Sequence, residues 1–151
     1  MSSGVGVDND CQAKFLEMKL RQKYRYVIYR LSADNKEIVV DKTGSIDSTY
    51  DDFIEDLSEH ECRWAVYDFD PKLDGDRQIR KLVFISWCPD VAHIRSKMIF
   101  TSSKETLRRQ LVGIGLDISG TELSEISFET SMSLEDIKRC LALGYKSLTR
   151  S

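Results

Sequence analysis

Two pairs of short strand-forming segments place the tightest constraint on how this chain can fold. The segments are rich in aromatic and β-branched residues, which favour strands, and they cover residues 24–31, 37–42, 63–70 and 80–87. Turn-forming residues join the first two segments (Ser32-Ala33-Asp34-Asn35), and a loop containing Asp74-Gly75-Asp76 joins the second two. Each pair is therefore predicted to be two strands connected by a turn or an exposed hairpin loop.

Helical patterns lie between and after these strands. Helices are expected over residues 8–21, 50–57, from 91 onward and 134–143, and a fifth strand over 125–130. In the first helix, Cys11, Phe15 and Met18 recur at helical spacing on one face, and Ser48 or Thr49 can cap the second.

This order of elements predicts an α/β fold, a single-domain sandwich with a central mixed five-stranded sheet flanked by helices. The domain is expected to span residues 1–151, with a flexible N-terminus over about 1–7 and a loose tail over about 145–151.

The longest helical stretch follows Pro89, which ends the fourth strand. Asp90 is expected to cap a helix that begins at Val91, with Val91, Ile94 and Met98 as its buried stripe.

The second half of this stretch carries its own start signal. Ser102 followed by Glu105 is a capping-box pattern, so we expect the helix to kink or restart there. Its inward residues and its end are predicted at Leu107, Leu111 and Ile114, and at Gly113 or Gly115.

Composition and cysteine spacing favour an intracellular globular protein. The sequence is 41% hydrophobic and 31% charged, and no apolar run approaches the ~20 residues that cross a bilayer. The polar start MSSGVGVDND does not resemble a secretory signal. The cysteines are widely spaced, which argues against a zinc site or a disulfide framework and predicts small core residues; they are Cys11, Cys62, Cys88 and Cys140.

Few residues suggest covalent chemistry. His60 and His93 are expected at exposed positions, and Cys88 lies on a different element from His93, which disfavours a catalytic pair. Asp68 and Asp70 alternate along one strand and are interpreted as a polar face rather than as an acid and base. No glycine-rich phosphate-binding motif occurs. We therefore expect no enzyme, no metal site and no cofactor.

A basic segment interrupts an otherwise acidic chain. Residues 77–111 hold eight Lys or Arg and two acids, whereas residues 41–76 hold twelve Asp or Glu and three Lys or Arg. This asymmetry favours an acidic partner. On a helix Arg95 and Lys97 diverge by about 200°, so one apolar stripe cannot bury both. Solvating charge on an amphipathic helix is the alternative, and a pI near 5.5 disfavours nucleic acid.

A series of short motifs, each present once, occurs in a characteristic order along nearly the whole chain. They are Ser3-Gly4-Val5, Phe15-Leu16-Glu17-Met18-Lys19, Lys23-Tyr24-Arg25-Tyr26, Tyr50-Asp51-Asp52-Phe53, Ala65-Val66-Tyr67-Asp68-Phe69, Trp87-Cys88-Pro89-Asp90, Ile94-Arg95-Ser96-Lys97-Met98-Ile99-Phe100, Ser102-Ser103-Lys104 and Leu107-Arg108-Arg109. In this order and spacing they resemble the actin-depolymerising factor/cofilin family. The resemblance implies an ADF-homology, gelsolin-like fold that binds G-actin and F-actin and promotes filament severing and depolymerisation. Two alternatives are a filament-binding member without strong depolymerising activity and a phosphoinositide-binding module.

The family's site residues carry over to matching positions. The site for monomeric and filamentous actin would comprise Ser3, Gly4, Val5, Arg95, Lys97, Met98, Arg108 and Arg109. The filament-side site would comprise Arg80, Lys81, Glu135, Lys138 and Arg139.

The resemblance also implies regulation at the N-terminal serine, here Ser3, with Ser2 as an adjacent alternative. A phosphate there would repel an acidic actin surface. It further implies a Ser3 kinase and phosphatase, competition by phosphoinositide headgroups, a monomeric state, and a place in the cytoplasm and actin cytoskeleton, with nuclear presence in addition. Some members sense pH through a histidine before the last helix, and residues 126–133 contain none.

Overall fold

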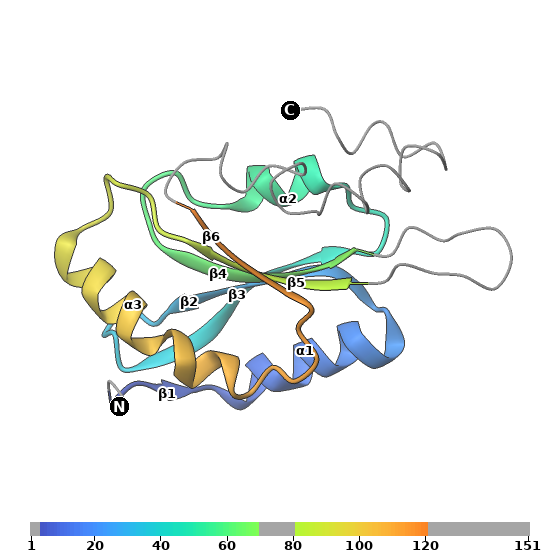
Figure 1. Cartoon of the computed structure of the whole chain (residues 1–151), viewed down its shortest axis with the longest axis horizontal. Coiled ribbons are helices and arrows are strands. Elements are labelled where there is room, and N and C mark those ends of the chain that lie inside the picture. The colour runs from blue at the N-terminus through green and yellow to red at the C-terminus, as the bar shows by residue number, and fades with distance from the viewer. Residues whose placement is uncertain (1–3, 70–80, 121–151) are drawn as a thin grey trace, which may run out of the picture.

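A six-stranded sheet with helices on both faces forms the centre of the computed structural model, which describes residues 4–69 and 81–120 (Figure 1). The strands are β1 (Gly6–Val7), β2 (Tyr24–Leu31), β3 (Glu37–Ser45), β4 (Arg63–Phe69), β5 (Lys81–Trp87) and β6 (Leu116–Gly120). The helices are α1 (Asn9–Arg21), α2 (Tyr50–Asp56) and α3 (Ile94–Arg108).

The sheet is mixed, as the sequence predicts. Its order is β1-β3-β2-β4-β5-β6, and the pairs β2–β3, β2–β4 and β4–β5 are antiparallel. Both edge strands pair in parallel, β1 with β3 and β6 with β5. The four strands of the two predicted pairs are therefore confirmed, with β3 running on to Ser45.

The predicted count of five strands is wrong, because the described residues alone already contain six. β1 has only two residues and is defined by its pairing, in which Gly6 N–H donates to Lys36 O at 3.0 Å. β6 is short and ends in glycine, so its sequence gives little strand signal. The strand expected over 125–130 and the helix expected over 134–143 lie outside the described residues.

Alternation along the strands divides the core into two layers, because successive side chains of a strand point to opposite faces. Val27 and Tyr29 of β2 pack with α1 and α3 on one face, whereas Tyr26 and Ile28 pack with α2 on the other. Figure 1 shows the same arrangement, with α1 and α3 below the sheet and α2 above it. The predicted α/β sandwich is confirmed.

Helices α1 and α2 form where the sequence predicts them. Cys11, Phe15 and Met18 are all buried on the sheet side of α1. Thr49 caps α2: its hydroxyl accepts from Asp52 N–H at 3.1 Å, and the Asp52 carboxylate accepts from Thr49 N–H at 2.9 Å. This reciprocal pair satisfies two N–H groups that the start of a helix otherwise leaves unpaired.

Helix α3 differs from its prediction at both ends. It begins at Ile94 rather than Val91, because His93, not Asp90, caps it: His93 Nδ1 accepts from Arg95 N–H at 3.2 Å. It ends at Arg108 rather than near the glycines, and Gly113 instead turns the loop toward β6 with a φ of +106°. Such a positive φ suits glycine, which has no Cβ.

The expected restart within this helix is also wrong. Residues 94–108 form one uninterrupted helix, and Ser102 makes no capping box. Its hydroxyl donates to Ile99 O at 3.2 Å, and Thr101 and Ser103 likewise donate to Lys97 O and Ile99 O. Hydroxyl groups bonded back to the preceding turn are compatible with a continuous helix.

The predicted buried stripe at the start of α3 is the largest error. Val91, Ile94 and Met98 are 69%, 67% and 66% exposed. The residues that face the core are Phe100, Ser103 and Leu107 instead. Met98 lies nine positions before Leu107, about 180° around the helix, so a helix that buries Leu107 must expose Met98.

Candidate functional site

The first two turns of α3 expose an apolar surface. Ile94 and Met98 are one helical turn apart on the same face, and Val91 lies just before the helix. An exposed cluster of large apolar side chains on one element is typical of a surface that contacts another protein. We call Val91, Ile94, Arg95, Lys97 and Met98 the α3 surface.

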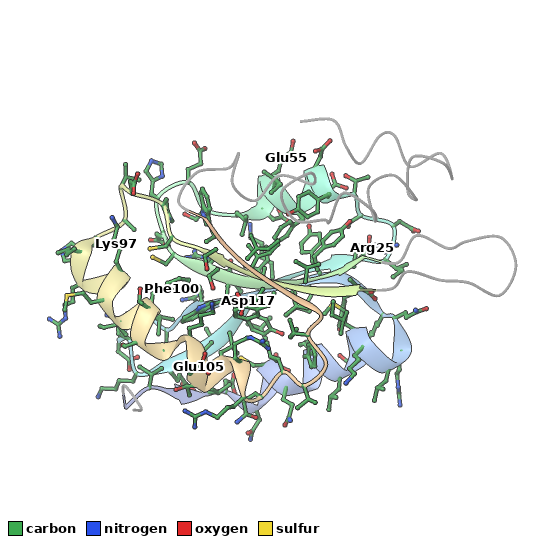
Figure 2. All side chains as sticks on the ribbon, in the orientation of Figure 1. Arg25, Glu55, Lys97, Phe100, Glu105 and Asp117 are labelled. Carbon is green, nitrogen blue, oxygen red and sulfur yellow. The ribbon has the colours of Figure 1, made fainter. Side chains whose placement is uncertain are left out.

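Two cations border these apolar side chains. Lys97 lies three residues after Ile94 and Arg95 lies three residues before Met98, so the two cations flank the apolar pair on opposite sides. Arg95 is exposed, and Lys97 is half-buried because its ammonium donates to Asp90 O at 2.7 Å. This bond ties Lys97 to the loop before the helix (Figure 2). The α3 surface therefore combines apolar area with positive charge.

Packing on the opposite side holds α3 in place. Phe100 stacks on Trp64 of β4, with ring centroids 4.1 Å apart, and Figure 2 shows Phe100 on the sheet side of the helix. Further along, Lys104 and Arg108 both pair with Asp117 of β6, at 3.0 Å and 3.1 Å. A helix anchored in this way presents its outer side chains in a fixed arrangement, which lowers the entropic cost of binding.

The two arginines predicted for the site near the end of α3, Arg108 and Arg109, differ in their contacts. Arg108 is engaged with Asp117 and also lies over the Phe84 ring, 5.4 Å from its centroid. Arg109 is exposed and follows the last helical residue. Arg109 is thus the more accessible of the two cations.

The N-terminal segment lies beside the same helix. Val5 is buried in the core layer that includes Phe100 and Leu107, and β1 follows it alongside α3 (Figure 1). Gly4 is exposed and has a φ of +84°, a conformation that L-residues rarely adopt. The predicted residues Gly4 and Val5 are therefore brought to the α3 layer, and Ser3 lies outside the described residues.

Of the residues predicted for the filament side, the structure describes only Lys81, which lies away from the α3 surface. Lys81 begins β5, at the end opposite Trp87, after which the chain leads to α3. At about 3.3 Å per residue, the two ends of this strand are about 20 Å apart. Arg80, Glu135, Lys138 and Arg139 lie outside the described residues.

Among residues 4–69 and 81–120, no three His, Cys, Asp or Glu side chains are grouped to hold a metal ion. His60 and His93 are exposed, and His93 uses Nδ1 for its helix cap. Within the same residues, no helix has the length and apolar character that crossing a membrane requires.

Fold and surface together define an α/β domain that presents an anchored helix with an apolar and cationic outer face. The family model of cofilin/tropomyosin-type actin-binding proteins matches residues 4–134. A cofilin from Mycosarcoma maydis is 48% identical over 86% of this chain and 93% of its own, and actin-depolymerizing factor 7 from Arabidopsis thaliana is 44% identical over 85% and 92%. The crystal structure of Streptomyces griseoflavus cofilin superposes with a TM-score of 0.77 at 40% identity, covering 91% of this chain and 97% of that one. The chain therefore belongs to the cofilin/actin-depolymerising factor family of actin-binding proteins, and the predicted resemblance is confirmed.

Two features of this region were not predicted from the sequence, namely the outward orientation of Val91, Ile94 and Met98 and the ion pairs of Asp117. A signal for the first was present. The inward positions assigned in the second half of the helix include Leu107, and stepping back four and seven residues reaches Ser103 and Phe100. That stripe places Ile94 and Met98 outward. Asp117 gave no comparable signal, because its contacts depend on how β6 packs beside α3.

Proposed function

We propose that this protein binds monomeric and filamentous actin through the α3 surface together with Ser3, Gly4, Val5, Arg108 and Arg109, and that it promotes filament severing and depolymerisation. The observation that carries the proposal is that Ile94 and Met98 are exposed on an anchored helix and lie between two cations, Arg95 and Lys97. The names of its relatives, cofilin and actin-depolymerizing factor, support the same activity.

The mechanism needs no bond-making by the protein. Apolar side chains of the α3 surface would lose water against actin, and the two cations would select an acidic rim around the contact. Binding one subunit conformation in preference to another shifts the equilibrium between them. A filament held in the less stable arrangement breaks and loses subunits more readily.

Filament contact is proposed to use a second surface, formed by Arg80, Lys81, Glu135, Lys138 and Arg139. The distance between the two ends of β5 supports two separate contacts, one for each neighbouring subunit of a filament. We further propose that phosphorylation of Ser3 weakens actin binding, because the N-terminal segment lies beside α3 and a phosphate adds roughly −1.5 to −2 charge. A single-domain monomer in the cytoplasm and actin cytoskeleton fits these roles, with phosphoinositide headgroups competing for the same cations.

Cosedimentation with filamentous actin tests the proposal. The double variant Arg95→Ala/Lys97→Ala is expected to pellet with actin at least tenfold more weakly than the wild type. The matched control is Arg21→Ala/Lys23→Ala, which removes the same charge at the far end of α1 (Figure 1). Equal binding by wild type and the α3 variant would contradict the proposed site.

Severing is measured separately, by microscopy of labelled filaments. We expect the wild type to increase the number of breaks per filament length, and Arg95→Ala/Lys97→Ala to lose this effect. Binding without any breaks would favour the alternative, a filament-binding member of the family that does not depolymerise.

A further inference from the structure

Two cysteines meet at the end of the sheet from which α3 departs. Cys62 immediately precedes β4 and Cys88 immediately follows β5, and these two strands pair with Arg63 opposite Trp87. The Cys62 thiol donates to the Cys88 sulfur, with the two sulfur atoms 3.4 Å apart. Cys11, the other cysteine of the described residues, donates instead to Ile38 O at 3.4 Å.

Backbone geometry places the two residues directly opposite each other. Cys88 N–H donates to Gly120 O in β6 at 2.9 Å, so its backbone groups point away from β4. Cys62 and Cys88 therefore face each other as a non-hydrogen-bonded antiparallel pair, the kind whose Cα atoms lie about 4.5 Å apart. A disulfide accepts Cα separations of about 4.4–6.8 Å, so a bond needs little backbone movement.

The two thiols differ in burial, which determines which of them a reagent reaches first. Cys62 is 8% exposed, and burial raises the pKa of its thiol to about 12, with the bond to Cys88 adding to the effect. Both residues line cavities, Cys62 one of about 490 Å³ and Cys88 one of about 360 Å³ beside Phe100 and Lys104, but Cys88 is the more exposed of the two, being only half-buried. A reagent from solvent thus reaches Cys88 more readily, and Cys62 lies close enough to react with the oxidised form of Cys88.

We propose that Cys62 and Cys88 form an oxidisable dithiol that reacts with peroxides and closes into an intramolecular disulfide. Cys88 sulfur attacks one oxygen of hydrogen peroxide, the O–O bond breaks, and Cys88 sulfenic acid and one water form. Cys62 sulfur then attacks Cys88 sulfur, the S–O bond breaks, and the released hydroxide takes the Cys62 proton to form a second water. Two thiols are oxidised by two electrons, and one peroxide is reduced to two waters.

The disulfide would fasten the loop before α3 to the start of β4. That loop contains Asp90, whose carbonyl oxygen accepts a hydrogen bond from the Lys97 ammonium. The positive charge of Lys97 is close enough to Cys62 to lower the pKa of its thiol, against the larger effect of burial. Oxidation therefore joins covalently two segments that in the reduced protein meet through the weak thiol contact.

Peptide mapping of the full chain tests this modification site. Reduced protein is treated with hydrogen peroxide, remaining thiols are alkylated, and digested peptides are examined by mass spectrometry with and without reductant. We expect two of the four thiols to be lost and a reductant-sensitive peptide that links Cys62 to Cys88. Links through Cys140, links between chains, or four thiols remaining would overturn the proposal.

Single variants test the order of the steps. In Cys62→Ser, Cys88 sulfenic acid is expected to persist and to be trapped by dimedone; in Cys88→Ser, Cys62 is expected to stay reduced. Cys140→Ser is the matched control and should form the disulfide as the wild type does. A wild-type protein in which Cys88 is oxidised while Cys62 is fully alkylated would also refute the proposal, whatever the variants show.

Discussion

The apolar residues of α3 form two groups, one buried and one exposed, and we expect the first to affect stability and the second to affect binding. Phe100 and Leu107 are at most 3% exposed, whereas Ile94 and Met98 are about two-thirds exposed. Removing a buried side chain costs its transfer free energy and leaves a cavity. Removing an exposed one changes the free energy of unfolding by about 0.5 kcal/mol or less. The two groups can therefore be separated by experiment.

The exposed group is expected to serve binding rather than stability. Ile94→Ala/Met98→Ala should lower actin affinity about tenfold or more, because the few residues near the centre of an interface that dominate binding each cost over ~1 kcal/mol when truncated, and ~1.4 kcal/mol is tenfold in affinity. Cosedimentation measures the affinity, and thermal unfolding should be nearly unchanged. Leu20→Ala, which truncates a 72% exposed leucine of α1, is the control. If the double variant bound actin with wild-type affinity, Ile94 and Met98 would not belong to the binding site.

The buried group is expected to serve stability. Phe100→Ala should lower the free energy of unfolding by about 3–5 kcal/mol, since it removes a ring stacked on Trp64 and leaves a cavity between α3 and β4. Chemical denaturation provides the measurement, with Met98→Ala as the control on the exposed face. A loss below about 1 kcal/mol would mean that the stack contributes little.

At the scale of elements, three contacts decide where α3 lies: the Phe100 stack, the hydrogen bond from Lys97 to the preceding loop, and the ion pairs to β6. Helices α1 and α2 could be predicted because each has one apolar face and a clear start. Helix α3 has large apolar residues on two faces, so periodicity alone left its orientation open. Its outer apolar face is the one that suits a partner.

The ion pairs to β6 are expected to make a small, salt-dependent contribution. Asp117→Asn should lower the free energy of unfolding by about 0.5–1 kcal/mol at low ionic strength, because Lys104, Arg108 and Asp117 remain partly exposed. The difference should shrink near 1 M salt, where the Debye length is about 3 Å. Denaturation at both salt concentrations tests this, with the exposed acid Asp47→Asn as control. An unchanged difference at high salt would indicate a role other than charge.

At the scale of the whole molecule, the two core layers bury several groups that ionise at alkaline pH. Burial raises the pKa of the Cys11 thiol from its ordinary value of 9.0 to about 12, and it raises the pKa values of Tyr29 and Tyr67 above 10.0. The folded protein thus holds these protons at pH values where the unfolded chain releases them. Their stabilising contribution is complete below about pH 9 and is lost as pH rises toward the folded values.

Stability should therefore fall above pH 9. Each group that ionises only in the unfolded chain lowers the free energy of unfolding by about 1.4 kcal/mol per pH unit. Cys11→Ala should reduce the slope between about pH 9 and pH 10 by up to that amount, although the variant is less stable throughout. Denaturation as a function of pH measures the slope, and Gln12→Ala, exposed on α1, is the control. Identical slopes in wild type and Cys11→Ala would contradict the assignment.

Much of the molecule follows from local sequence. The four inner strands, α1 and α2 are specified by short-range patterns: alternation along β2, the 3.6-residue spacing of Cys11, Phe15 and Met18, and the Thr49 cap. The order and spacing of the short motifs predicted the protein family, and the family model that matches residues 4–134 confirms this prediction. The separation of about 200° between Arg95 and Lys97 on a helix also predicted that at least one of them lies outside the apolar stripe, and Arg95 is exposed.

Tertiary structure decided what local patterns left open. Strand β1 exists because β3 offers it a partner, and β6 because β5 does. Which apolar face of α3 is buried depends on Trp64 and the β6 carboxylate, and the meeting of Cys62 with Cys88 depends on the register of β4 and β5. Sequence determines which residues can be buried, since that depends on spacing along one element. Only packing between elements decides which of them are, because the free energy of burial belongs to both surfaces in contact.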